Sequence, residues 1–218
     1  CALAAARIRW VEEHGQEALA DQIARLCAER GLKAATAVVA LDSALFMQHA
    51  VHSDFDDLKK IAATVRFDTE DALPTDVSDM AVAFRIASTS DEGANLDVFT
   101  AQRSILSDIL MSLQRHGIDP VAVFPDAYCL CRYVGGRVNL AETDDEDAIY
   151  ALFSDARGYF VGSPTENGVP IMRAFLVGPS QDRKVLLSRE AVITRALAGS
   201  SGVAGQLRVF NASGTLTA

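Results

Sequence analysis

The stretch VFTAQRSILSDILMSLQRHGIDPVAVFPDAYCLCRYV, residues 98–134, decides the fold because it reads as strand, helix, strand and helix in immediate succession. Apolar residues recur at helical spacing over residues 105–113, and Gly117 is placed to close that helix in the left-handed conformation. The apolar run 121–124 is too short for a helix, and Asp126 behind it suits the start of one. This order predicts an α/β unit.

Toward the N-terminus the sequence continues to alternate between helical and strand patterns. Gly31 is placed to end an amphipathic helix, and Asp42 lies in a polar turn after a buried strand. Asp54 is a candidate N-cap for the next helix. The predicted elements are helix 5–30, strand 36–41, a helix following Asp54 and ending before Pro74, strand 80–86, a polar linker over 88–95 and strand 96–101.

Toward the C-terminus the pattern becomes sheet-like after an acidic run at residues 142–147. The predicted elements are strands at 148–153, 158–161 and 169–177, a helix at 188–198 and a last strand at 206–210. The Asn167-Gly168 pair is a hairpin signal, so a three-stranded meander is the simplest topology for the three strands.

Composition excludes several classes of protein. The 218 residues are 50% hydrophobic and 22% charged, which is typical of an ordered globular chain of one or two domains. The net charge of −9 and the absence of a basic stripe argue against a nucleic-acid binder. No apolar run is long enough to span a bilayer, and four cysteines in this pattern predict reduced thiols in a cytoplasmic protein.

Three segments together resemble the actin-like PilM family of type IV pilus assembly and the related cytoplasmic part of the type II secretion L component. The first, AERGLKAATAVVALDSALFMQHAV (28–51), passes from a helix through an apolar strand and a polar turn to a second strand. The second, DFDDLKKIAATVRFDTEDALPTDVSDMAVAFRI (54–86), leads from a helix through a Leu-Pro turn to an alternating strand. The third is the stretch 98–134 quoted above.

The resemblance implies a two-lobed actin-like fold of the ribonuclease H-like type, an α/β architecture with an inserted small αβ subdomain. It places the first lobe at residues 1–134, the inserted subdomain at about 32–87, and a second lobe with the β-meander at 135–218. It also implies that the second lobe is incomplete, because the family continues into further helix and strand.

The same resemblance implies where a nucleotide would bind. Residues 1–15, CALAAARIRWVEEHG, hold no Asp-x-Gly turn for a first phosphate loop. Ser154, Asp155 and Gly158 occupy the place of the second phosphate loop, and Ser213 and Gly214 that of the adenosine loop. These five residues are candidate relics of a degenerate nucleotide site. Ordinary turn formation by Asp and Gly explains Asp155 and Gly158 equally well.

Other constellations point less clearly to a site. His49 and His52 lie near Asp54, yet no third or fourth ligand is obvious, so a surface pair is favoured over a metal site. Cys129 and Cys131 diverge on a helix, which favours packing over redox chemistry. No nucleophile elbow, zinc-protease motif or Walker-type loop occurs.

The resemblance therefore implies a non-catalytic scaffold, without a catalytic residue, metal or cofactor, in a pilus-assembly or type II secretion platform. The expected partner is a short cytoplasmic segment of a membrane-anchored subunit, and the expected location is the cytoplasmic face of the inner membrane. The alternative is an actin-like ATPase of the same machinery that binds or slowly hydrolyses ATP with Mg²⁺.

Overall fold

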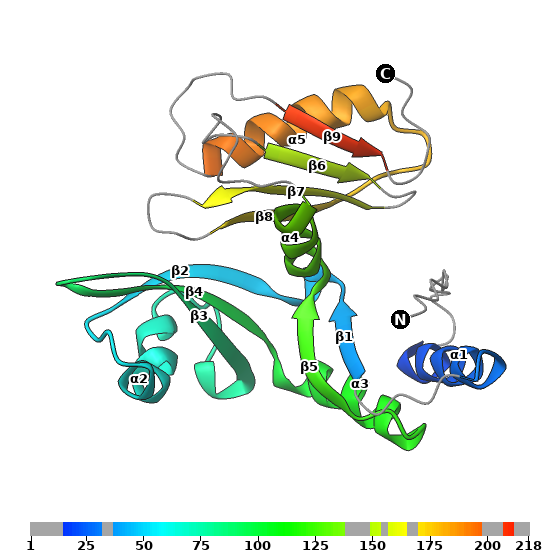
Figure 1. Ribbon diagram of the computed structural model, residues 1–218, viewed down its shortest axis with the longest axis horizontal. Coiled ribbons are helices and arrows are strands. Elements are labelled where there is room, and N and C mark those ends of the chain that lie inside the picture. Colours follow the sequence, from blue (N-terminus) through cyan, green and yellow to red (C-terminus); the bar gives the residue numbers. More distant parts are fainter. Residues whose placement is uncertain are drawn as a thin grey trace.

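The fold has two lobes that meet at one helix, α4 (Asp126–Arg137), in the computed structural model (Figure 1). The structure describes residues 15–31, 37–137, 149–153, 157–164, 170–197 and 207–211. Segments far apart in the sequence pack within each lobe. The mixed α/β architecture predicted from the sequence is confirmed.

The first lobe is built on a pair of parallel strands, β1 (Ala37–Leu41) and β5 (Pro120–Pro125). Helices α1 (Gly15–Glu29) and α3 (Arg103–Arg115) pack beside them. Gly31 and Gly117 follow the two helices with φ of 61° and 73°, as the sequence predicts for left-handed C-terminal caps. The buried centre of this core holds Ala20, Leu41, Ile109 and Leu113.

The small subdomain is an antiparallel sheet in the order β2-β4-β3, with a helix on one face. Its elements are β2 (Met47–Ser53), α2 (Leu58–Glu70), β3 (Met80–Ser90) and β4 (Gly93–Gln102), with short 3-10 turns η2 (Ser43–Leu45) and η3 (Val77–Asp79) before β2 and β3. The face toward α2 buries an apolar core around Ile61, Leu96 and Val98. The opposite face carries Asp97 and Phe99, since side chains alternate along β4.

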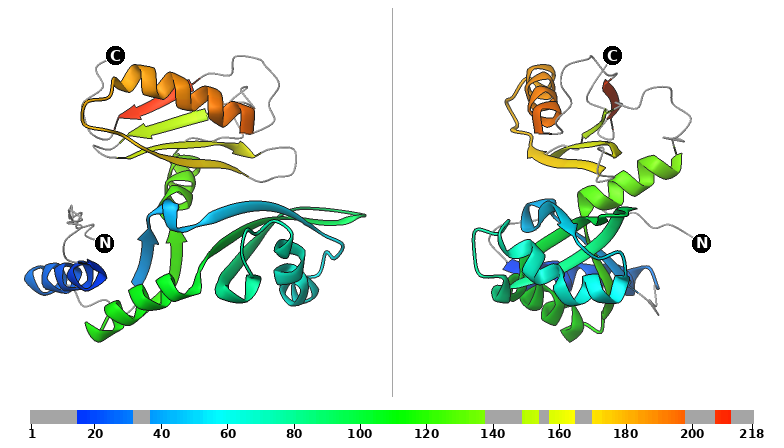
Figure 2. Two further views of the ribbon diagram at one scale, coloured as in Figure 1. Left: turned by 180° about the vertical axis from the view of Figure 1, so that it is seen from behind. Right: turned by 90° about the vertical axis from the view of Figure 1, so that its left-hand side faces the viewer.

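The second lobe is a four-stranded sheet in the order β8-β7-β6-β9, covered on one face by a helix. Its elements are β6 (Ile149–Phe153), β7 (Arg157–Pro164), β8 (Pro170–Leu176), α5 (Arg183–Leu197) and β9 (Leu207–Asn211). Figure 2 shows α5 across one face of the sheet, while α4 lies between this sheet and the first lobe. Phe160 and Phe175 stack in the core beneath α5, with ring centroids 5.3 Å apart.

Some predicted boundaries are wrong. Asp57, not Asp54, caps α2, because its carboxylate accepts from the N–H groups of Lys59 and Lys60. The predicted linker 88–95 is mostly strand, since β3 and β4 form a tight hairpin in which Ser90 pairs with Gly93. Helix α5 begins five residues earlier than predicted.

The predicted division of the chain between residues 134 and 135 lies within α4, and β4 of the small sheet lies after residue 87. The domain limits stay a prediction. Among the residues that the structure describes, no helix is long and apolar enough to cross a membrane.

Candidate functional site

The two lobes approach each other where β1 and β5 end. Because these strands are parallel and Leu41 is in register with Pro125, the residues that follow them, Asp42 and Asp126, emerge at the same edge of the sheet. Asp42 begins the η2 turn, where its carboxylate accepts from the N–H of Ala44 at 2.9 Å. Asp126 begins α4, where an acidic side chain suits the helix N-terminus.

The Asp126 carboxylate is surrounded by donors from three parts of the chain. Its Oδ1 accepts from the backbone N–H and hydroxyl of Ser43, with the N–H at 2.9 Å, and from the N–H of Ala127 at 2.8 Å. Its Oδ2 accepts from the hydroxyl of Tyr159, on β7 of the second lobe, at 2.6 Å. Asp126 therefore links the η2 turn, α4 and the second lobe.

A second link joins Arg157 of β7 to Asp42 through an ion pair. Arg157 and Tyr159 alternate with Gly158 and Phe160, so they lie on the face of the sheet that is turned away from α5. We refer to Asp42, Ser43, Asp126, Arg157 and Tyr159 as the interlobe network.

The electrostatics of the interlobe network follow from this packing. Burial raises the pKa of Tyr159 well above its ordinary value, and the hydrogen bond to Asp126 and the negative charges of Asp126 and Asp42 raise it further. The phenol is therefore a neutral donor at any physiological pH.

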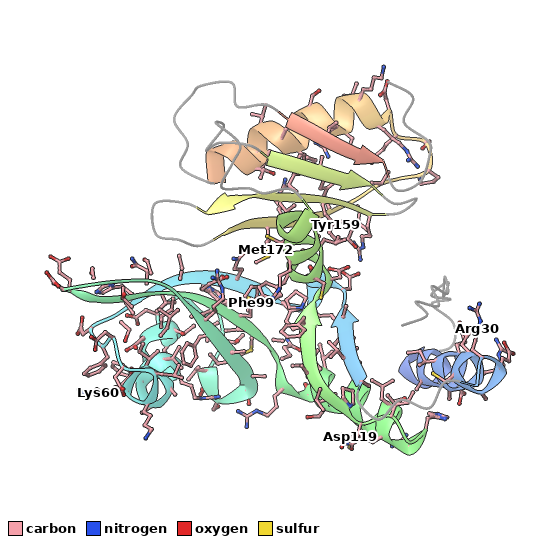
Figure 3. The ribbon with its side chains drawn as sticks, viewed as in Figure 1. Arg30, Lys60, Phe99, Asp119, Tyr159 and Met172 are labelled. Atoms are coloured by element: carbon pink, nitrogen blue, oxygen red, sulfur yellow. The ribbon has the colours of Figure 1, made fainter. Side chains whose placement is uncertain are left out.

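A cavity of about 250 Å³ lies beside the interlobe network, between the η2 turn and the edge strand β8. Its walls include Gln48 and Phe99 from the first lobe and Met172 and Arg173 from the second. Figure 3 shows Tyr159 and Met172 beside α4 at the second lobe, and Phe99 below them in the first lobe. Arg173 is held from the α5 side by an ion pair to Glu190 at 2.6 Å.

A second concavity, with a volume of about 210 Å³, lies between β3 and β5, and its lining is mostly apolar. Five consecutive residues of β3, Ala81 to Arg85, line it, although their side chains alternate between the two faces of the sheet. The surface therefore runs along β3, which pairs with β4 alone among the described strands and so has one open edge. We call it the β3 groove.

Aromatic residues of α4, β5 and β4 line the rest of the β3 groove. Tyr128 of α4 stacks on Phe124 of β5 and meets Phe99 of β4 edge-on, with ring centroids 5.6 and 5.8 Å apart. Opposite this wall, the small side chains of Ala81 and Ala83 leave the space open. Tyr128 and Phe99 also border the interlobe cavity, so the two concave surfaces share a wall.

Of the five residues predicted as relics of a nucleotide site, the structure describes one. Ser154, Asp155, Ser213 and Gly214 lie outside the described residues. Gly158 is buried in β7, and a Cβ atom there would overlap the ring of Phe175. Packing beneath α5 accounts for this glycine without a phosphate.

The histidine and cysteine candidates do not form a site. His49 contacts Thr100 Oγ1 at 3.0 Å, whereas His52 contacts the Glu92 carbonyl at 3.2 Å from the opposite face of the sheet. No cluster of three or more metal-ligating side chains occurs in the described parts of the chain. Burial raises the pKa of both Cys129 and Cys131, which disfavours reactive thiolates.

Sequence reasoning missed the interlobe network. Asp42 and Asp126 carried a signal, because both followed apolar strands, but they were interpreted only as a turn and a helix start. The sequence around Arg157 and Tyr159 gave no signal of a site beyond the alternation of these two residues with buried ones. Their role depends on how α4 places the second lobe, which local pattern does not encode.

The fold defines an actin-like, two-lobed protein. It is similar to the solved "PilM-PilN type IV pilus biogenesis complex", with a TM-score of 0.72 and 16% identity over 92% of this chain and 69% of that one. It is also similar to the cytoplasmic domain of EpsL, an inner membrane component of the type II secretion system of Vibrio cholerae, with a TM-score of 0.57 and 20% identity over 93% of this chain and 70% of that one.

Sequence then narrows the class to one family. Residues 11–146 match the family described as "Type II secretion system (T2SS), protein L". The chain therefore belongs to that family, as the resemblance predicted, and is a component of type II secretion machinery. None of the curated protein sequences compared with the chain matches it.

Proposed function

We propose that this protein is a non-catalytic scaffold of the secretion platform, and that its β3 groove binds a short cytoplasmic segment of a membrane-anchored subunit. The groove carries the proposal, because an apolar channel beside a strand with an open edge suits an extended peptide that adds to the sheet. A protein with this role works on the cytoplasmic side of the inner membrane.

The similarity to a solved PilM-PilN complex supports the same reading, since a protein of this fold assembles there with a partner. A peptide in the β3 groove would pair its backbone with β3 and place apolar side chains between Ala83 and Tyr128. Affinity would come from the main-chain bonds, and selectivity from the side chains that alternate into the groove.

The interlobe network supports the absence of catalysis. A magnesium nucleotide needs a carboxylate that is free to orient the metal or its water. Asp126 already accepts four hydrogen bonds from the chain, and Asp42 is paired with Arg157. Nucleotide binding by these residues would have to break contacts that hold the lobes together.

Overlapping synthetic peptides that span the cytoplasmic segments of the platform's membrane subunits provide the test of docking. We expect at least one peptide to bind with a Kd tighter than about 100 μM by fluorescence polarisation, and Ala83→Glu to abolish that binding by placing a charge in the groove. Ala63→Glu is the matched control, because Ala63 is an exposed alanine on the outer side of α2. Binding by none of the peptides, or equal loss in both variants, would contradict the proposal.

Calorimetric titration with Mg-ATP separates the scaffold from the ATPase alternative. The scaffold predicts no heat beyond dilution and no release of phosphate. Saturable binding that Arg157→Gln alters would instead favour a nucleotide site beside the interlobe network.

A further inference from the structure

A polar cavity of about 560 Å³ lies where β3 begins, and residues of η3 and of the first turns of α3 line it. Its lining carries the hydroxyl groups of Thr75, Ser78, Ser104 and Ser107, and it includes no aromatic side chain. None of its lining residues also lines the β3 groove. The volume lies within the range of about 300–1,000 Å³ that is usual for small-molecule sites.

Two arginine side chains converge on one backbone oxygen beside this cavity. Arg66 of α2 and Arg103 of α3 each donate from Nη2 to the carbonyl oxygen of Met80 at 3.2 Å. The two Nη2 atoms are therefore at most 6.4 Å apart, which is twice 3.2 Å. Arg66 Nη2 also donates to the Val77 carbonyl at 2.6 Å, so backbone oxygens hold this side chain in place. Of the two arginines, Arg103 lines the cavity.

The positive charges of this pair are not balanced by a carboxylate. Among the residues that the structure describes, neither arginine forms an ion pair. Arg173 and Arg189 also converge on one residue, but there the acceptor is the carboxylate of Glu190. Two cations this close repel each other, and Arg103 is also the first residue of α3, where a cation opposes the helix dipole. An anion bound beside Arg103 would offset both costs.

The lining favours a phosphate group over a carboxylate as this anion. A phosphate monoester has three terminal oxygens that accept hydrogen bonds, and Arg103 and the hydroxyls together supply donors in that number. The exposed carboxylate of Asp79 also lines the cavity, where it can accept from a hydroxyl of the same ligand. Because the lining includes no aromatic ring, nothing there can stack on a nucleotide base.

We propose that this cavity binds a small hydroxylated phosphate monoester, with Arg103 and the hydroxyls of Ser78 and Ser104 as donors to the phosphate oxygens. Arg66 adds positive charge and fixes the Met80 carbonyl to which Arg103 is bonded. The net charge of −9 favours a free ligand over the same chemistry on an anionic membrane surface. The cavity is separate from the β3 groove, so this proposal does not depend on peptide docking.

The probe is glycerol 3-phosphate, titrated at constant ionic strength and followed by the amide chemical shifts of the protein. We expect saturable shifts centred on residues 78–80 and 102–107, with a Kd tighter than about 5 mM. Arg103→Gln should lose about tenfold in affinity. Arg115→Gln is the matched control, because it removes the same charge from the last residue of α3, and it should lose less than about twofold.

A second variant has the opposite expected sign. Asp79→Asn removes the one negative side chain of the lining and breaks no described side-chain contact, so it should bind inorganic phosphate about threefold more tightly than the wild type. Because Arg103→Gln also loses its bond to Met80, its melting temperature is measured beside its affinity. If Arg103→Gln does not fold, the gain in Asp79→Asn supports the site, and the absence of that gain overturns it.

Three results would count against the proposal. If the wild type shows no saturable shifts, or if Arg103→Gln and Arg115→Gln lose affinity equally, the two arginines only hold β3 in place and the phosphate site is wrong. Binding to vesicles that contain phosphatidylglycerol, without binding of glycerol 3-phosphate, would overturn the free ligand.

Discussion

The interlobe network and the β3 groove differ in how completely their side chains are paired with other parts of the chain. At the interlobe network, the two carboxylates receive donors from the chain on both sides of the gap. Along the β3 groove, which shares the Tyr128 wall, most of the lining side chains are apolar and only partly buried in the described structure. The first arrangement holds a structure together, and the second leaves surface for a ligand.

The largest predicted effect breaks the interlobe network at its centre. Asp126→Ala leaves the donors of Ser43 and Tyr159 without their acceptor, and we expect it to lower the free energy of unfolding by about 3 kcal/mol. Urea denaturation measures this change. Asp119→Ala is the control, because exposed Asp119 accepts only from the Gln114 amide among the described contacts, and it should cost less than about 0.5 kcal/mol. Equal small losses would mean that Asp126 does not join the lobes.

The next effect concerns the one described residue of the predicted phosphate loop. Gly158→Ala would place a methyl group against the Phe175 ring, and we expect this overpacking to cost about 2 kcal/mol in denaturation experiments. Gly178→Ala is the matched control, since the atoms nearest to its Cβ would belong to the exposed, flexible Gln181 side chain, and it should be nearly neutral. If Gly158→Ala has the stability of the wild type, packing against Phe175 does not explain this glycine. The predicted role of Gly158 in a phosphate loop would then be favoured.

Much of the fold could be predicted because local signals and tertiary packing agree. The apolar periodicity of α3 and the glycines at 31 and 117 predicted helices and their ends correctly. Predicted helix boundaries were wrong where more than one residue could act as the cap. Asp54 and Asp57 are both suitable N-caps by residue type, and the hydrogen bonds that the Asp57 carboxylate accepts from Lys59 and Lys60 identify Asp57 as the cap.

The site could be predicted only in part, because its residues meet through tertiary structure. Arg85 and Asp97 were ordinary members of two strands until the register placed them opposite each other. The polar residues over 88–95 suggested a linker, yet Asn95 and Ser88 face each other across a hairpin, where the Asn95 amide donates to the Ser88 hydroxyl at 3.0 Å. Polarity alone did not separate an exposed strand from a loop.

A smaller effect tests the contribution of the second lobe to the interlobe network. Tyr159→Phe removes one hydrogen bond to a carboxylate, and we expect a loss of about 1.5 kcal/mol at neutral pH. The folded-state pKa of Tyr159 lies above the ordinary value of about 10, so its contribution is complete below that pH and declines as the pH rises beyond it. Stability should therefore fall more steeply above pH 10 in the wild type than in Tyr159→Phe. Parallel slopes would contradict the buried contact.

The smallest effect concerns the ion pair at the rim of the interlobe network. Arg157 and Asp42 keep 28% and 39% of their side-chain surface exposed, so solvent screens their attraction. We expect Arg157→Gln to cost about 0.5 kcal/mol at low salt, and the difference from wild type to shrink at high salt. Arg25→Gln, which breaks a more exposed pair with Glu29, should cost less still. Because Arg157 lies outside the β3 groove, peptide affinity should not change; if it falls with Arg157→Gln, the two surfaces are coupled through α4 and the contrast between a structural site and a docking site no longer holds.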